Sequence, residues 1–298
     1  MGAGALHRPV LLAEVLRHLA PERGGLFVDA TVGPGGHAEA ILAASPAARV
    51  VGFDRDAASL AVARQRLALF GDRVRLHQTD FRDLAREARA LGIEMVDGIL
   101  FDLGLSSLQL ERSGRGFTFQ ADEPLDMRYD TTRPGTAAEL LRRAPEPELV
   151  RILREYGEER AARRIARRIV LARGRAPLAT TGALARLVAA AIPAGRRPRR
   201  IHPATRTFQA LRIAVNDELG ALEAALPQAA ALLGPGGRLA VISFHSLEDR
   251  LVKTAFRGLA AQGAWRILTP KPVGPSRAEV EANPRARSAK LRVLARAA

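Results

Sequence analysis

The sequence predicts an α/β protein in which a mostly parallel sheet is interrupted by a helical insertion. Two observations lead to this prediction. Over roughly the first hundred residues, short β-like runs alternate with single helical patterns, which is the order of βαβ units. From residue 106 the alternation stops and helical patterns follow, and it resumes after Pro203. We therefore expect one α/β core whose two parts, 1–112 and 205–298, flank an inserted α-helical domain at 113–204.

Each element follows from a local pattern. The predicted strands are β-like runs at 26–30, 50–53, 73–78, 99–103, 238–243, 265–268 and 290–294. The helices predicted in the first part of the core are at 37–44, 57–69 and 81–90. After a segment rich in Gly, Ser and charge at 106–134, the insertion has helical patterns at 146–155, 158–173 and 181–191. The second part of the core has a long helix at 205–226, another that begins at Pro227, a turn at 234–237 and a helix at 246–256.

The composition excludes several classes of site. The 298-residue chain has no Cys, which excludes a disulfide scaffold, an iron–sulfur cluster, a thiolate zinc site and a Cys nucleophile. The six His are scattered and no H-E-x-x-H motif occurs, so we expect no dedicated metal site. No apolar run approaches about 20 residues and the N-terminus has no secretory pattern, so we expect no membrane span and a cytoplasmic location.

The positive charge is concentrated in one part of the chain. The net charge is +15, and an arginine-rich composition of this kind is typical either of a GC-rich genome or of a protein that binds a polyanion. Residues 142–212 contain 18 Arg and 5 Glu, a balance of 18 − 5 = +13, which leaves +2 on the rest. Ile165 and Ile169 lie four residues apart with Arg around them, and residues 196–200 form a basic loop. This window is therefore either a solvated surface or an RNA-binding region that contacts phosphates, and its shortage of acids favours the second.

A glycine-rich turn follows the first predicted strand. Gly33, Gly35 and Gly36 lie between that strand and a helix, where glycine permits a positive φ and a close approach of the backbone to a ligand. Asp54 ends the next strand, where an acid can accept hydrogen bonds from ribose hydroxyls. The pair indicates a nucleoside-containing ligand, against a plain turn and a helix-capping Asp. Asp29 would repel a pyrophosphate but suits a sulfonium, so the pattern favours S-adenosylmethionine over NAD.

Further candidates follow other strands. Asp80 can accept from an adenine amine and Phe81 can stack on the ring, although a core role for Phe81 is equally consistent. Asp102 ends the fourth strand, where it can accept hydrogen bonds from an amine or simply cap a helix. His245 follows the fifth strand, and Ser246 is predicted to be the N-cap of the helix after it.

Nearly the whole chain resembles the MraW (RsmH) family of bacterial 16S ribosomal RNA cytosine-N4 methyltransferases. The segments that carry the resemblance include HRPVLLAE (7–14), DATVGPGGH (29–37), FDRD (53–56), residues 102–110, GFTF (116–119), PLDMR (124–128), YGEER (156–160), HPATRTFQALR (202–212), FHSLEDR (244–250) and residues 283–292. The resemblance implies a class I S-adenosylmethionine-dependent methyltransferase fold, Rossmann-like with a mostly parallel seven-stranded sheet and an inserted α-helical domain. It also implies methylation of N4 of a cytidine in the decoding region of 16S ribosomal RNA, with the small ribosomal subunit as partner.

By motif position, the resemblance implies a set of cofactor contacts. They are Gly35, Gly36, His37, Asp54, Phe81, Asp102 and Gln109. Leu108, beside Gln109, stands where the family often has Pro. Asp102, or a hydroxyl of Ser106 or Ser107, is the candidate catalytic acceptor for the amine. The Asn/Asp-Pro-Pro-aromatic motif of many amino-methyltransferases is absent, which leaves the identity of the proton acceptor open. Two alternatives stay open at this point, an NAD-dependent oxidoreductase and a non-catalytic RNA-binding ribosome-assembly factor.

Overall fold

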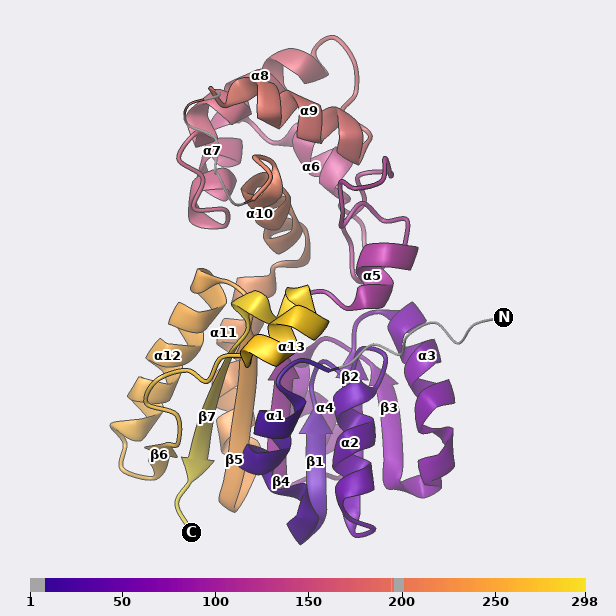
Figure 1. Ribbon diagram of the computed structural model, residues 1–298, viewed down its shortest axis with the longest axis vertical. Helices are drawn as coiled ribbons and strands as arrows, with labels where there is room; N and C mark the ends of the chain where they lie inside the picture. Colours follow the sequence, from indigo (N-terminus) through magenta and orange to yellow (C-terminus); the bar gives the residue numbers. More distant parts are fainter. Residues whose placement is uncertain (1–8, 194, 196–200) are drawn as a thin grey trace. The chain divides into compact units, whose positions relative to one another are not determined.

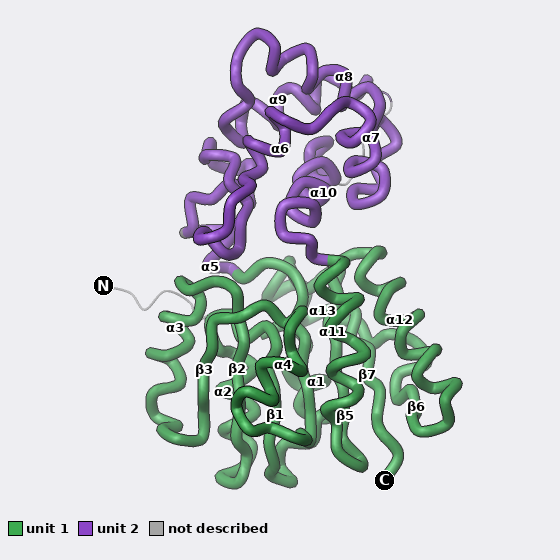
Figure 2. Tube along the Cα trace, turned by 180° about the vertical axis from the view of Figure 1, so that it is seen from behind, with its two compact units in different colours: residues 1–106, 219–298 green, residues 107–218 purple. Residues whose placement is uncertain are grey.

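The computed structural model describes residues 9–193, 195 and 201–298. The chain divides into two compact units (Figure 2). The first, the α/β unit, comprises the described residues up to Ser106 together with Leu219–Ala298; the second, the helical unit, comprises Ser107–Glu218. Among the described residues, no helix combines the length and the apolar character that crossing a lipid bilayer needs.

A seven-stranded mixed sheet forms the centre of the α/β unit (Figure 1). The strands are β1 (Gly25–Asp29), β2 (Ala48–Asp54), β3 (Val74–Gln78), β4 (Val96–Asp102), β5 (Leu233–Ser243), β6 (Trp265–Ile267) and β7 (Lys290–Arg296). Their order is β3-β2-β1-β4-β5-β7-β6, parallel except for β7, which is antiparallel to both neighbours. The predicted fold class is therefore confirmed.

Helices cover both faces of this sheet because successive side chains along each strand point to opposite faces. Phe27 packs on one face with α1 (Leu12–Leu19), α2 (Gly36–Ala44) and α3 (Ala57–Leu67). Val28, the next residue, packs on the other with α4 (Leu84–Ala90), α11 (Glu218–Leu232) and α12 (Ser246–Ala260). The two apolar clusters make a three-layer unit that fixes the carboxyl ends of the parallel strands. A further helix, α13 (Arg277–Ala282), follows β6 in the chain.

The helical unit is built from short helices around a separate apolar core. Its helices are α5 (Ser107–Arg112), α6 (Ala137–Arg143), α7 (Glu146–Glu155), α8 (Ala162–Arg173), α9 (Thr181–Ala191) and α10 (Thr205–Asn216). On α8, Ile165 and Ile169 are fully buried while the arginine pairs on either side are exposed, as the sequence pattern predicts. The predicted basic loop at 196–200 lies outside the described residues.

The predicted helix at 205–226 is wrong in its extent. The chain forms α10 and α11 instead, separated at Asp217, whose φ of 47° is left-handed. The Asp217 N–H donates to the Ile213 carbonyl, which is a left-handed end of a helix. Pro227 does not begin a helix but lies inside α11, where buried Leu222 and Leu226 hold the helix against the sheet.

Candidate functional site

Three acids end three adjacent parallel strands of the α/β unit. Asp29 ends β1, Asp54 ends β2 and Asp102 ends β4, and β1 lies between the other two. The strand order reverses between β1 and β4, and ligands of open α/β sheets bind at the carboxyl edge beside such a reversal. The sequence placed all three acids at this edge, and the structure brings them there.

The glycine turn joins β1 to α2. Gly35 has a φ of 86° and precedes the first residue of α2, so the helix begins without a side-chain cap. A Cβ on Gly36 would lie 2.6 Å from Cγ of Pro9, closer than side chains tolerate. Gly33 donates its N–H to Oδ2 of Asp54 at 2.8 Å, which ties the turn to the end of β2. Backbone N–H groups at the start of α2 thus adjoin the acidic edge.

His37 connects the start of α2 to the end of β4. Its Nδ1 lies 3.4 Å from Oδ2 of Asp102, and its Nε2 lies 3.0 Å from the carbonyl oxygen of Val10. Since a carbonyl only accepts, Nε2 carries a proton. Burial alone would lower the pKa of His37, but the hydrogen bond and charge of Asp102 raise it. Buried His37 and the partly exposed Asp102 therefore form a pair in which the carboxylate stabilises the charged form of the imidazole.

The other two acids carry perturbed pKa values. Burial raises the pKa of Asp29 to about 7, against the opposing charge of His37. Burial also raises the pKa of Asp54 to about 6, although its two oxygens accept the N–H groups of Gly33 and Asp56, each at 2.8 Å. Carboxyl groups this desolvated are stabilised by a cationic ligand, because it restores the favourable environment that water would provide.

Asp102 is fixed by contacts of its backbone and of one carboxylate oxygen, and its other oxygen has no hydrogen-bond partner among the described residues. Its backbone N–H donates to Oγ1 of Thr31 at 2.6 Å, a contact that sequence reasoning missed although Thr31 precedes the glycine turn. Oδ2 faces His37. Oδ1 is buried and has no hydrogen-bond partner among the described residues. An acceptor that is fixed but unused at this edge is suited to a donor from a ligand or substrate.

Asp80 and Phe81 follow β3 in a more occupied setting. Oδ1 of Asp80 lies 2.9 Å from Nη2 of Arg55, and the guanidinium of Arg55 lies 5.1 Å from the centroid of the Phe81 ring. Phe81 also meets Phe101 edge-on at 5.5 Å and is only half-buried. Arg55 is a further member of this group that sequence reasoning missed. Contact of Phe81 with an adenine stays a prediction.

Gln109 belongs to the helical unit, whereas the other six predicted cofactor residues belong to the α/β unit. It lies on α5 and is buried, with 6% of its surface exposed, and its carbonyl oxygen accepts from the Ser113 hydroxyl at 2.6 Å. The structure thus gives Gln109 a defined place on α5. A role toward the cofactor stays a prediction.

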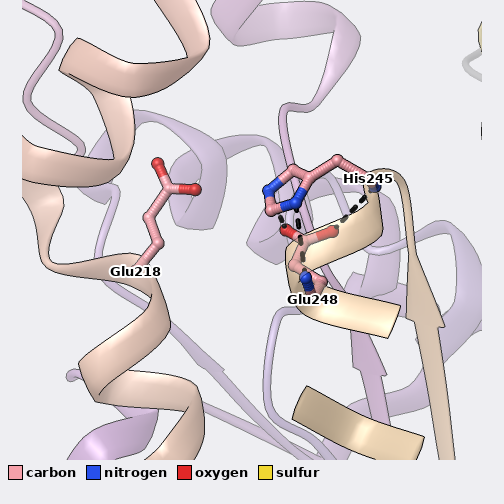
Figure 3. Close-up of side chains that lie close together, drawn as sticks. All are labelled: Glu218, His245 and Glu248. Atoms are coloured by element: carbon pink, nitrogen blue, oxygen red, sulfur yellow. Dashed lines mark hydrogen bonds and ion pairs between the residues drawn. The ribbon is translucent and has the colours of Figure 1, made fainter. Parts of the chain in front are cut away.

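His245, after β5, is the N-cap of α12, so the prediction of Ser246 as the cap is wrong. Nδ1 of His245 accepts from the Glu248 N–H at 3.3 Å, while Oε2 of Glu248 accepts from the N–H groups of His245 and Phe244 (Figure 3). The imidazole displaces the hydroxyl because Glu248 completes a reciprocal capping box with it. This reciprocal cap accounts for Nδ1 of His245, whereas Nε2 is buried without a hydrogen-bond partner among the described residues and lies 3.1 Å from Oε1 of Glu248.

Together, the strand order and the acidic edge define a class I methyltransferase-type α/β unit. The family model described as the MraW methylase family matches residues 4–297, and the chain belongs to that family. It is 55% identical over 303 residues to the ribosomal RNA small subunit methyltransferase H of Geobacter sulfurreducens, covering 96% of this chain and 97% of the relative. The protein of the same name from Heliobacterium modesticaldum is 53% identical over 303 residues, covering 96% and 97%.

Family membership confirms the resemblance seen in the sequence. The chain is a methyltransferase, and S-adenosylmethionine is its cofactor. The alternatives of an NAD-dependent oxidoreductase and of a non-catalytic assembly factor find no support.

Proposed function

We propose that this methyltransferase transfers the methyl group of S-adenosylmethionine to the exocyclic N4 of a cytidine in the decoding region of 16S ribosomal RNA within the small ribosomal subunit. Relatives that match almost end to end are named ribosomal RNA small subunit methyltransferases, which supports ribosomal RNA as the substrate. The choice of cytosine N4 follows from the family resemblance. A ribosomal substrate also implies that the reaction takes place in the cytoplasm.

The observation that carries the site assignment is the unpartnered Oδ1 of Asp102. This buried acceptor lies at the edge where the acids and the glycine turn meet, so the residues present fit the cofactor. The residues proposed to hold it are Gly35, Gly36, His37, Asp54, Phe81, Asp102 and Gln109. When bound, S-adenosylmethionine supplies an electrophilic methyl group on a sulfonium.

Asp102 is the proposed catalytic acceptor. The lone pair of cytosine N4 is delocalised into the ring, so the amine is a weak nucleophile and gains most from being held in line and shielded from water. A carboxylate oxygen that accepts an N–H of the amine fixes its direction and stabilises the positive charge that develops on nitrogen. His37 holds the other oxygen of Asp102, and the base must leave its stack in the folded RNA to reach this edge.

The helical insertion at 113–204 is the proposed RNA-binding part. It contains most of the +13 window, and on α8 the pair Arg163–Arg164 is exposed. Contacts between arginine and phosphate supply most of the affinity of proteins for nucleic acid.

Labelled S-adenosylmethionine, supplied with assembled small subunits, naked ribosomal RNA or DNA, tests the proposal when nucleosides are analysed afterwards. We expect N4-methylcytidine from ribosomal RNA. Asp102→Asn should lower methyl transfer far more than it weakens binding of S-adenosylhomocysteine, whereas Asp72→Asn, at an exposed carboxyl, should change neither. A different methylated nucleoside refutes the cytosine assignment, and full turnover in Asp102→Asn refutes the role of this carboxylate.

A further inference from the structure

A cavity of about 680 Å³ lies within the helical unit. Among its described lining residues are five arginines and one acid: Arg154, Glu159, Arg160, Arg163, Arg164 and Arg206. They come from α7, from the loop before α8, from α8 itself and from α10. The volume falls in the range of about 300–1,000 Å³ that is usual for ligand clefts. The cavity is therefore of ligand size and strongly cationic.

Most arginines of this cavity have side chains that are free to bind a ligand. Within the described part of the chain, Arg154, Arg160, Arg163 and Arg164 make no ion pair and no side-chain hydrogen bond, and all four are exposed. Some arginines elsewhere in the unit do make such contacts. For example, Arg173 donates to the carbonyl oxygens that end α6, at 2.6 Å each.

The one acid of the cavity makes no ion pair with these arginines among the described residues and offsets at most one of the five positive charges. Glu159 is buried, with 6% of its surface exposed, and its Oε1 accepts the N–H of Ala161 at 2.7 Å. Its carboxylate is thus held by the backbone before α8. Arg206 donates one N–H to the carbonyl oxygen of Glu158, at 3.1 Å. Its other N–H groups have no partner among the described residues. Five like charges in one concavity repel one another, and anions placed between them relieve that repulsion.

Phosphodiester groups match this arrangement. Each carries one negative charge with two terminal oxygens, which the planar guanidinium engages with two parallel hydrogen bonds. The four arginines from 154 to 164 lie along one stretch of chain that turns from α7 into α8, so they present several donors side by side. A single small anion would satisfy only part of this set, whereas a strand with regularly spaced phosphates would satisfy more of it.

We infer that this cavity binds consecutive backbone phosphates of an RNA strand and anchors the substrate on the helical unit. The choice of RNA rests on the proposed function. The readout is sequence-independent, because phosphates carry no base information.

The test compares two double variants of the full-length protein on the same helix. Arg163→Gln/Arg164→Gln removes two cavity arginines, and Arg167→Gln/Arg168→Gln removes the equally exposed pair one turn later, which does not line the cavity. Fluorescence anisotropy with a labelled single-stranded RNA is measured from about 50 to 200 mM salt. We expect the cavity variant to bind roughly tenfold more weakly and its salt slope to fall by about 1.4, at about 0.7 per lost phosphate contact.

The control pair should change the affinity less than threefold, and both variants should unfold at the wild-type temperature. Arg163→Lys/Arg164→Lys should retain the salt slope, because the charge remains. Equal losses in both Gln variants, or no loss in the cavity variant, overturn the inference. Binding of ATP that depends on the cavity, with RNA binding unaffected, would assign the site to free nucleotides and overturn it as well.

Failure of the proposed function gives a different result from failure of this inference. If nucleoside analysis shows another product while the salt slope still responds to Arg163 and Arg164, the cavity assignment stands and the cytosine assignment falls. If N4-methylcytidine forms and the cavity variant keeps the wild-type KM for small subunits and the wild-type salt slope, the cavity assignment falls alone.

Discussion

Replacing Asp29 by Asn should stabilise the protein in a pH-dependent way. Burial raises the pKa of this carboxyl from 3.8 to about 7, so ionising it in the folded state is unfavourable. A group whose pKa is higher in the folded state contributes stability at low pH, and that stability is lost as the pH rises through the folded pKa. Asn keeps the shape and the oxygen that accepts the Thr31 N–H, but it never ionises.

The magnitude follows from the shift. At about 1.36 kcal/mol per pKa unit, a shift from 3.8 to about 7 amounts to roughly 4 kcal/mol when Asp29 is fully ionised. At pH 5, only the stability associated with the pH range from 3.8 to 5 has been lost, which is a little under 2 kcal/mol at about 1.36 kcal/mol per unit. The advantage of Asp29→Asn over the wild type should therefore grow by about 2–3 kcal/mol between roughly pH 5 and pH 8.5.

Urea unfolding without cofactor at the two pH values measures this difference. Asp72→Asn, which changes an exposed carboxyl, serves as the control and should show the same stability relative to wild type at both. If the advantage of Asp29→Asn does not grow with pH, or if the variant is less stable than wild type at the higher pH, Asp29 is not a destabilised carboxylate.

Three further substitutions, one of them with a control, test local contacts. Gly36→Ala places a Cβ 2.6 Å from Cγ of Pro9, so we expect a loss of about 1–3 kcal/mol in urea unfolding and weaker binding of S-adenosylhomocysteine by calorimetry. Glu248→Ala removes the acceptor of two N–H groups at the start of α12 and should cost about 2–3 kcal/mol, whereas Glu281→Ala, at an exposed ion pair, should cost under about 1 by the same assay. Arg173→Ala loses two bonds to carbonyl oxygens and should lower the thermal midpoint of the helical unit while leaving the salt slope of RNA binding unchanged.

The sheet could be predicted because its signals are local. Runs such as 50–53 and 99–101 are apolar, and single helical patterns between successive strands leave parallel crossovers as the simplest path. The antiparallel direction of β7 had no such signal. It follows from tertiary pairing, since β7 inserts between β5 and β6, the two strands that precede it in the chain.

The break between α10 and α11 could not be read from periodicity. Residues on both sides of Asp217 continue a helical pattern, and the left-handed turn at that one residue ends the first helix. Pro227 gave the opposite error. Proline is common at the first position of a helix, so the sequence predicts a helix start where the structure has the middle of α11. Inside α11, the buried apolar side chains on either side of Pro227 pack against the sheet and outweigh the lost backbone hydrogen bond.

The site shows the same division between local and tertiary information. Asp29, Asp54 and Asp102 could be placed because each ends a predicted strand, and the ends of parallel strands meet at one edge. The contact of His37 with Asp102 joins residues far apart in the sequence, so no spacing encodes it. The same holds for the Thr31 hydroxyl that fixes the backbone of Asp102.

Charge is divided between the two units in a way that the total of +15 conceals. The α/β unit has three acids at one edge. Burial raises the pKa values of Asp29 and Asp54, so a cationic ligand would stabilise their ionised forms. The helical unit gathers five arginines around one cavity. A sulfonium cofactor and a polyanionic substrate need opposite fields, and a single surface cannot supply both. Placing the arginines on an inserted unit and the acids at the sheet edge satisfies the two requirements with one chain.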